Sequence, residues 1–543
     1  MNELNAVDIA VIAGYFLLIL YIAFRAVRKG RKKNEASFKD SEEYFLGGRD
    51  LGWFVIGASL FASNIGSEHL VGLAGQGASG DFVAAQFELL ASLILLILGW
   101  LFVPFYLKSG VFTMPEFLER RYSSAARNYL SWVSIVAYVL TKISVTIAAG
   151  GIVFTALLGI DFWTGAILIV LITGVYTVLG GLKAVVYTDM IQMFILIGGA
   201  IGVTVFGLQE VGGLEVLSSK VSSDHLSLWR PLSDEAFPWT GILFGAPILG
   251  VWYWCTDQFI VQRVLSAKDL DNARKGTIFA GYLKLLPLFI FVLPGVIAYA
   301  LSIGPDAPLS FPMEDGKEQY DAALPVLVMQ VLPTGLRGLV VAGLLAALMS
   351  SLSSVFNSCS ALFTIDIYKK FRPETPERRL VLVGQVATVV LVVLGLAWIP
   401  MLNILEGGLF QKLQSIQAYI APPIAAVFLL GLFIRRLNGF GAMASLLTGA
   451  VLGVARLILE LNKAELSGFW LWYSDINFLH FALFLFALCS VVLVVASLIT
   501  TQDDNPDIEL VTYQRSSTPF KMSNVVLSVG LVAAILLLWW IFR

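Results

Sequence analysis

The sequence predicts an all-α membrane protein of about 14 transmembrane helices, built around two inverted repeats of five helices. The 543 residues are 58% hydrophobic and only 14% charged, whereas a soluble protein carries roughly 25% charged residues. Apolar runs of about 20 residues, long enough to cross a hydrocarbon core of ~30 Å, recur along the whole chain. Two of these runs are interrupted at matching places, which is typical of membrane folds with inverted repeats.

Hydropathy places the helices by residue range. We expect spans near 7–26, 52–77, 82–107, 128–158, 161–180, 185–208, 239–262, 275–302, 336–367, 379–401, 408–434, 438–460, 477–499 and 522–542. The first run is followed by basic residues, which is opposite to a cleavable signal peptide, so we expect it to persist as a helix. In a single transporter-like domain over 1–543, the repeats are predicted at 52–208 and 239–434. The helices at 7–26, 438–460, 477–499 and 522–542 are then peripheral.

Basic residues gather in alternate loops and predict the orientation. The loop after the first helix is the richest, and the others repeat the bias: Arg28, Lys29, Arg31, Lys32 and Lys33; Arg120 and Arg121; Arg263, Lys268, Arg274 and Lys275; Lys369, Lys370, Arg372, Arg378 and Arg379; Arg435 and Arg436. By the positive-inside rule these loops face the cytoplasm. An even number of helices then puts both termini outside, in a multi-pass protein of the cell membrane.

Composition also excludes several classes of function. Lys and Arg number 36 against 38 Asp and Glu, so no basic surplus favours nucleic acid as a partner. The cysteines Cys255, Cys359 and Cys489 all fall in apolar runs, which argues against a disulfide framework. We find no metal triad, nucleophile elbow or phosphate loop, so an enzyme is not expected. Nothing in the sequence indicates an oligomeric state.

The first interrupted run lies at 57–69, where small and polar residues replace the usual Leu and Val. Its break is expected near Asn64–Gly66, and Glu68 and His69 follow within one turn. A second break is expected at Gly245, Pro247 and Gly250. In hydrocarbon a broken helix needs protein, water or a ligand to satisfy its backbone, so the breaks predict a site near the midplane. The alternative is that the small residues only let helices pack closely.

Two charged residues, Glu88 and Lys284, lie far from the predicted ends of their spans. A charge at that depth costs about 2.5–3.5 kcal/mol on insertion scales unless it is paired or hydrated. The two could simply pair with each other. Alternatively, both point into a wet cavity and bind a polyhydroxylated solute, together with other side chains that offer hydrogen bonds and an aromatic face. That predicted substrate set is Asn64, His69, Glu88, Tyr253, Trp254, Lys284 and Gln414.

Four serines, Ser350, Ser351, Ser353 and Ser354, interrupt the otherwise apolar run 336–367. A single serine would be expected to bond back to a carbonyl of its own helix, but four within five positions cover more than one face. Hard cations prefer oxygen ligands. These hydroxyls, with carbonyls freed at Ala62 and Ile65, predict a nearly neutral cage for a monovalent ion.

Asp189 lies just inside the cytoplasmic end of a predicted helix. It could be an interfacial carboxylate favoured by the helix dipole or part of a cation site. The residue and its neighbours do not decide between the two.

The stretches at 57–75, 110–117, 180–192, 252–263, 284–287, 349–368 and 414–423 resemble the solute:sodium symporter family, and within it the sodium/glucose cotransporters. The resemblance implies a LeuT-like fold with a ten-helix core that works by alternating access and is driven by inward Na⁺. It places the sodium site at Ala62, Ile65, Ala347, Ser350 and Ser351 and a second sodium at Asp189, Ser353 and Ser354. Sugar contacts match the substrate set above. The gates match Leu73, Phe87 and Phe410 on the outer side and Tyr253 on the inner side.

Three residues depart from the vertebrate sugar carriers, namely Leu89 for Trp, Gln417 for Thr and Glu68 for Gly. The departures bear on which sugar binds. The main prediction is a Na⁺-coupled importer of a neutral sugar of the glucose or galactose type. Its alternatives are a Na⁺-coupled carrier of myo-inositol, another polyol or a sugar acid, and a sugar sensor on the same scaffold.

Overall fold

A computed structural model of the protein describes most of the chain. The described residues are 4–33, 49–66, 68–305, 307–314, 316–402, 409–501, 506–513 and 520–543. The side chain of Glu68, which was predicted to add a carboxylate beside the first break, lies outside what is described, as do the side chains of the basic residues at 28–33.

The described chain up to residue 211 contains one long helix and then the first predicted repeat, which is almost entirely helical. Its elements are α1 (Ala6–Lys33), α3 (Trp53–Asn64), η3 (Glu68–Leu73), α4 (Ala74–Ser79), η4 (Phe82–Ala85), α5 (Gln86–Ile97), η5 (Leu98–Phe102), α6 (Val103–Ser109), α7 (Met114–Arg121), α8 (Ser124–Tyr138), η6 (Val139–Ile143), α9 (Ser144–Leu158) and α10 (Phe162–Val211). One helix, α10, covers both spans predicted at 161–180 and 185–208.

The next part of the chain, up to residue 433, contains two short helices and then the second predicted repeat with one small hairpin. Its elements are α11 (Leu214–Lys220), η7 (Ser223–Leu226), η8 (Gly241–Gly245), α12 (Ala246–Gly250), η9 (Val251–Thr256), α13 (Gln258–Leu265), α14 (Leu270–Leu283), η10 (Leu288–Val292), α15 (Leu293–Ser302), β1 (Met313–Glu314), β2 (Lys317–Glu318), η11 (Tyr320–Ala322), α16 (Ala323–Val331), α17 (Leu336–Ala361), η12 (Leu362–Tyr368), α18 (Lys369–Phe371), α19 (Glu377–Leu402) and α20 (Leu409–Phe433). The two strands pair antiparallel.

The remaining elements follow the second repeat. They are α21 (Gly439–Leu461), η13 (Lys463–Glu465), α22 (Gly468–Asp475), α23 (Phe478–Ile499), α24 (Ile508–Val511) and α25 (Met522–Ile541). In the described chain, ten helices are long and apolar enough to span a membrane. Shorter apolar helices at Ala6–Ile19, Trp53–Asn64, Phe162–Gly174 and Gly241–Thr256 occupy the other four predicted positions. The all-α membrane fold is therefore confirmed, while fourteen remains the predicted span count.

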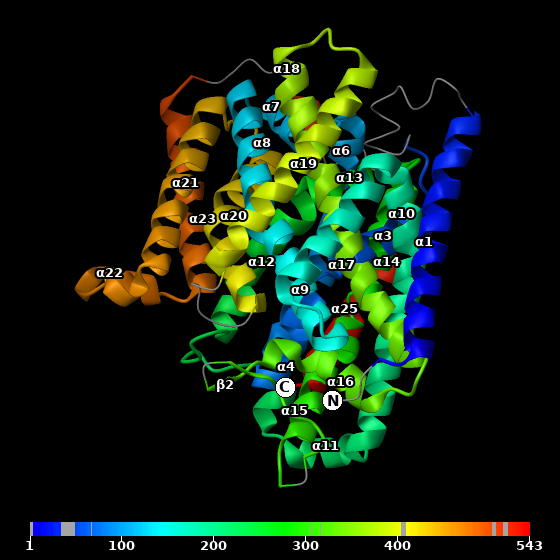
Figure 1. Ribbon diagram of the computed structural model, residues 1–543. Coiled ribbons are helices and arrows are strands. Elements are labelled where there is room, and N and C mark those ends of the chain that lie inside the picture. Colours follow the sequence, from blue (N-terminus) through cyan, green and yellow to red (C-terminus); the bar gives the residue numbers. More distant parts are fainter. Residues whose placement is uncertain are drawn as a thin grey trace.

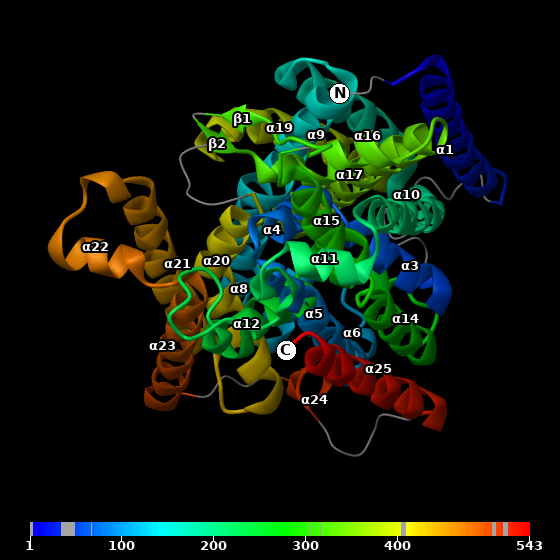
Figure 2. The same cartoon turned by 90° about the horizontal axis from the view of Figure 1, so that it is seen from below.

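The helices form one bundle with its long axis along most of them (Figure 1). α1 stands at one edge, the pair α21 and α23 stands at the opposite edge, and α25 lies along a third side (Figures 1 and 2). α17 runs through the middle, and nearly all its side chains are buried. The start of α1 and the end of α25 lie at the same end of the bundle, opposite α18 (Figure 1).

The first break lies where the sequence predicts it. α3 ends at Asn64, and Ile65 has an extended backbone with φ −69° and ψ 98°. The second break does not lie at Gly245–Gly250 as expected, because η8, α12 and η9 continue as helix through those residues. It lies at Asp257, which is extended with φ −79° and ψ 126°.

The glycines around the expected second break have a packing role instead. A Cβ added at Gly241 would come within 2.8 Å of the Cβ of Leu479, and one at Gly245 would meet the backbone of that same residue. These glycines therefore let α23 approach closely. Pro247 lies inside this continuous helix, directly after the π-helical turn η8.

Candidate functional site

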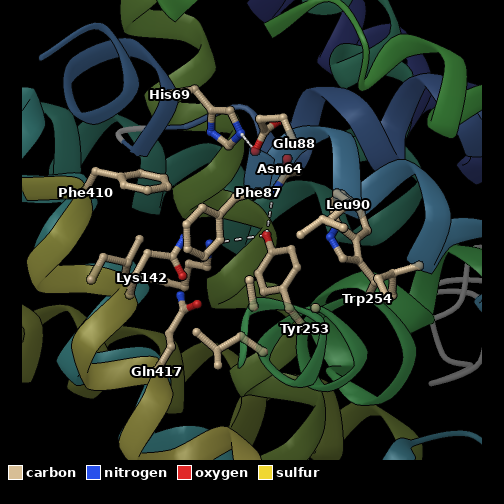
Figure 3. A pocket seen from close by; sticks show the side chains of 17 residues that line it. Asn64, His69, Phe87, Glu88, Leu90, Lys142, Tyr253, Trp254, Phe410 and Gln417 are labelled. Carbon is tan, nitrogen blue, oxygen red and sulfur yellow. Dashed lines mark hydrogen bonds and ion pairs between the residues drawn. The ribbon is translucent and has the colours of Figure 1, made fainter. Parts of the chain in front are cut away.

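One cavity lies between the two breaks, and six of the seven predicted substrate residues line it. Asn64, His69, Glu88, Tyr253, Trp254 and Gln414 face it, from α3, η3, α5, η9 and α20 (Figure 3). Its volume is about 60 Å³, which is room for several water molecules. The two segments that carry breaks therefore meet at one polar cavity, as the repeat pattern predicts.

The seventh residue, Lys284, lies behind the cavity wall and not on it. Its side chain is fully buried, and its ammonium group forms an ion pair with the Glu88 carboxylate. It also lies 3.1 Å from Nε2 of His69, which is in turn 3.1 Å from Oε1 of Glu88. The pairing alternative from the sequence is thus the observed geometry. Glu88 and His69 remain on the cavity side, so Lys284 can act on a ligand only through them.

Tyr253 lines the cavity, and its hydroxyl oxygen accepts two hydrogen bonds. Nδ2 of Asn64 donates to that oxygen at 2.8 Å, and Nζ of Lys142 donates at 3.2 Å (Figure 3). The Lys142 ammonium also lies 4.4 Å from the centroid of the Tyr253 ring, a cation–π distance. Oδ1 of Asn64 is buried and has no hydrogen-bond partner among the described residues, so an acceptor is available to a ligand hydroxyl.

Lys142 is a site residue that sequence reasoning missed. It lines the cavity and is buried, although only Glu88 and Lys284 were identified as charges at membrane depth. The available signal was a lysine near the middle of the span predicted at 128–158. Gln417, noted only as a departure from the family pattern, also lines the cavity (Figure 3).

Two aromatic rings close the opposite side of the cavity. Phe87 and Phe410 lie 5.4 Å apart between centroids and meet edge to face at 82°, a favourable arrangement. Both line the cavity, as expected of outer gates. Leu73, the third predicted outer gate, ends η3 in the buried core and does not line the cavity.

The predicted sodium site lies beside the first break. Oγ of Ser351 donates to the carbonyls of Ser63 at 3.0 Å and Ile65 at 3.3 Å. Ser351 on α17 therefore contacts the carbonyl that the extended Ile65 backbone frees. Ala62, Ala347 and Ser350 are buried on the same two helices, α3 and α17. Carbonyl and hydroxyl oxygens are the kind of ligand that a hard cation prefers.

Asp189 is fully buried and lies in the middle of the continuous helix α10, so no helix start lies beside it whose dipole could favour the carboxylate. Its Oδ1 accepts from Ser350, and its Oδ2 accepts from Ser59 at 2.9 Å. The guanidinium of Arg263 lies 3.7 Å from Oδ2. Any cation bound at Asp189 would share this carboxylate with Arg263.

The other two members of the predicted second site have separate partners. Oγ of Ser354 accepts from Arg263 at 2.5 Å, whereas Ser353 donates back to the Ser350 carbonyl of its own helix at 2.9 Å. The back-bonding alternative thus describes Ser353. Arg263 and Ser59 were both missed by the sequence analysis as partners of Asp189.

Known proteins are similar to this chain over most of its length. Residues 44–449 match the model of the sodium:solute symporter family. The chain is 39% identical to sodium/glucose cotransporter 1 of Sus scrofa, with 93% of this chain and 80% of the relative covered. It is 42% identical to a sodium/mannose cotransporter of Bos taurus, with 94% and 90% covered. It is 38% identical to the human sodium/myo-inositol cotransporter, with 94% and 76% covered.

Solved structures share the fold at lower identity. A Na⁺-coupled sialic acid symporter superposes with a TM-score of 0.75 at 21% identity, covering 92% of this chain and 99% of the other. Mhp1, a nucleobase-cation-symport-1 family transporter, gives 0.54 at 13% identity, covering 87% and 99%. The LeuT-like fold is thereby confirmed. From the family match and the identities, the chain belongs to the sodium:solute symporter family.

Proposed function

We propose that the protein is a Na⁺-coupled symporter that imports a neutral sugar of the glucose or galactose class by alternating access. The observation that carries the proposal is the contact between Ser351 and the Ile65 carbonyl, one residue from Asn64 on the cavity wall. The oxygen atoms that we propose as Na⁺ ligands therefore lie directly beside a polar cavity. The sodium:solute symporter match and the sugar cotransporter relatives support the same conclusion. The protein is thus a membrane transporter, not an enzyme.

The cavity wall supports a ring of alcohols as substrate. Asn64, Gln414 and Gln417 offer amide donors and acceptors, and Glu88 offers a carboxylate that accepts hydrogen bonds. Lys284 balances the Glu88 charge, which favours an uncharged substrate at that wall. The Tyr253 ring supplies an apolar surface against which a sugar ring can lie. A hexose is larger than the cavity, so we expect side chains of the gates to move when it enters.

The same contacts suggest how Na⁺ and sugar are coupled. A cation bound by the Ile65 carbonyl and Ser351 holds the end of α3 against α17. That fixes Asn64, which in turn holds the Tyr253 hydroxyl at 2.8 Å. Sodium therefore raises the affinity for sugar, and by linkage sugar raises the affinity for sodium. A second ion at Asp189, Ser353 and Ser354 belongs to the same proposal.

We further infer the orientation in the cell membrane. The start of α1 and the end of α25 lie opposite α18, which carries Lys369 and Lys370 (Figure 1). Basic loops face the cytoplasm, so both termini are placed outside.

Uptake into proteoliposomes tests the function and identifies the substrate. Labelled glucose, galactose, mannose and myo-inositol are offered with and without an inward Na⁺ gradient. We expect a hexose to enter fastest and only with Na⁺. Preferred uptake of myo-inositol would favour the polyol alternative, and a sugar-evoked current without tracer uptake would favour a sensor.

A further inference from the structure

The short helix α22 (Gly468–Asp475) joins α21 to α23 and exposes a row of large aromatic side chains. Phe469, Trp470 and Trp472 are 62%, 56% and 62% exposed. Each large aromatic carries about 150–250 Å² of surface that can be buried, and apolar surface left in water is unfavourable. Three adjacent exposed rings therefore indicate a surface that is covered in the working protein.

The position of α22 is fixed by contacts with its neighbours. Arg456 of α21 donates to the carbonyls of Tyr473, Ser474 and Ile476, at 2.5 Å for Ser474 and 2.9 Å for Ile476. An ion pair of 3.3 Å between Lys463 and Asp475 links the two ends of the connection. The exposed aromatic row is thus held in one place relative to the bundle.

That place is the level at which two membrane helices end. α21 ends at Leu461 and α23 begins at Phe478. α22 runs across their direction and projects away from the bundle (Figures 1 and 2). The outward faces of α21 and α23 are apolar and exposed as well, for example Ile458 at 55% and Phe484 at 55%. The aromatic row is therefore continuous with the surface that faces lipid.

We propose that α22 is an interfacial membrane anchor, whose aromatic row (Phe469, Trp470 and Trp472) inserts among the lipid headgroups at the level where α21 ends and α23 begins. Tryptophan is the side chain most typical of this layer, since its ring is apolar and its N–H is polar. Lys463 and Asp475 then lie at the aqueous edge. A second copy of the chain is the competing occupant.

Contacts from α22 through α21 reach α20, the helix that forms part of the cavity. The Tyr419 hydroxyl of α20 donates to Glu460 of α21 at 3.3 Å, and Glu460 pairs with Arg456. α20 also carries Phe410 and Gln414. An anchored α22 therefore holds the α21–α23 pair as a fixed support beside the helix that forms part of the cavity.

Spin labelling tests the proposal directly, because Cys255, Cys359 and Cys489 are all buried and a nitroxide reagent will select an added surface cysteine. Trp472→Cys is compared with Ala464→Cys, exposed in the connection before α22, and with Phe484→Cys on the lipid-facing side of α23. The full-length protein is reconstituted into phosphatidylcholine–phosphatidylglycerol vesicles. The readout is the ratio of nitroxide accessibility to oxygen over that to a water-soluble nickel chelate.

We expect the ratio at 472 to lie between the two controls, several-fold above that at 464. A ratio equal to that at 464 would put α22 in water and overturn the proposal. Exclusion of both reagents together with spin–spin broadening would show a second copy and overturn it as well. If the Trp472→Cys protein does not fold, Phe469→Cys gives the same comparison. Because the readout does not involve uptake, its outcome is independent of the proposed function.

Discussion

A hydrogen bond between Tyr138 and Asp257 connects the end of α8 to the second break. The Tyr138 hydroxyl, at the end of α8, donates to Oδ1 of Asp257 at the second break and accepts from the Phe259 N–H at 3.1 Å. One turn further along the chain, Lys142 holds Tyr253. Two contacts thus connect the same segments, and the one between Lys142 and Tyr253 lies in the cavity wall. Tyr253 is the predicted inner gate, so we expect both contacts to hold that gate closed.

Tyr138→Phe should weaken this gate. Loss of one buried hydrogen bond costs about 1 kcal/mol, which is roughly a fivefold shift of a two-state equilibrium. We expect faster sugar efflux and an apparent KM for external sugar that is a few times higher, measured by tracer flux in both directions. Tyr129→Phe is the control. Tyr129 lies on α8 like Tyr138, but its hydroxyl bonds the Leu446 carbonyl of α21, so its loss should leave the efflux rate and the KM unchanged. Equal fluxes in the two variants would remove Tyr138 from the gate.

Ser351→Ala should lower the affinity for Na⁺. The hydroxyl is the contact between α17 and the freed carbonyl of Ile65, and its loss should raise the half-saturating Na⁺ concentration about tenfold, equivalent to about 1.4 kcal/mol. Ser360→Ala is the matched control, because its hydroxyl is buried on the same helix without a hydrogen-bond partner in the described chain. Unchanged Na⁺ dependence in Ser351→Ala would exclude this serine as a ligand.

The Glu88–Lys284 pair can be tested separately for its contribution to stability and for its contribution to sugar binding. Glu88→Gln leaves a buried ammonium without its counter-charge, and breaking a buried pair costs about 3–5 kcal/mol. We expect a lower Tm and no uptake. The double variant Glu88→Gln, Lys284→Met removes both charges and should regain most of the stability but not the uptake. Recovery of uptake would show that the pair is structural only. Asp366→Asn, at a buried pair with Arg127 outside the cavity, is the control and should retain uptake.

His225 should make stability depend on pH. Burial, and then the charge of Arg230, holds the pKa of His225 below its ordinary value of 6.5, against a smaller opposite effect of Asp224. The unfolded chain therefore binds this proton more readily than the folded protein. The stabilisation is complete above pH 6.5 and is lost as the pH falls from 6.5 toward the lower folded pKa. Thermal melts from pH 8 to 5 should fall less steeply below pH 6.5 in His225→Gln. Parallel curves for the two proteins would contradict this.

The sequence predicts the helices and the first break well, because both depend on local composition. The apolar runs predict the spans. The small and polar residues before Asn64 predict the helix end, where a residue of α17 bonds the freed Ile65 carbonyl. The second break was misplaced because Gly245 and Gly250 are equally compatible with a broken helix and with close packing. Only the positions of Leu479 beside Gly245 and of Ile94 beside Gly250, both far along the chain, decide between these.

Side-chain direction explains the other differences. Lys284 was expected on the cavity wall, but whether its ammonium group faces a ligand or a carboxylate depends on how α14 is rotated against α5. Lys142 and Arg263 were missed as site residues for the same reason, since their partners Tyr253 and Asp189 lie far along the chain. Pairing across helices requires the tertiary structure.

The most direct test of the account is the accumulation ratio of the preferred hexose in proteoliposomes with clamped membrane potential and a fixed inward Na⁺ gradient. Na⁺-coupled symport predicts an internal sugar concentration above the external one, which rises with the gradient and collapses to equality when a sodium ionophore is added. A ratio that stays at one whatever the Na⁺ gradient would contradict it.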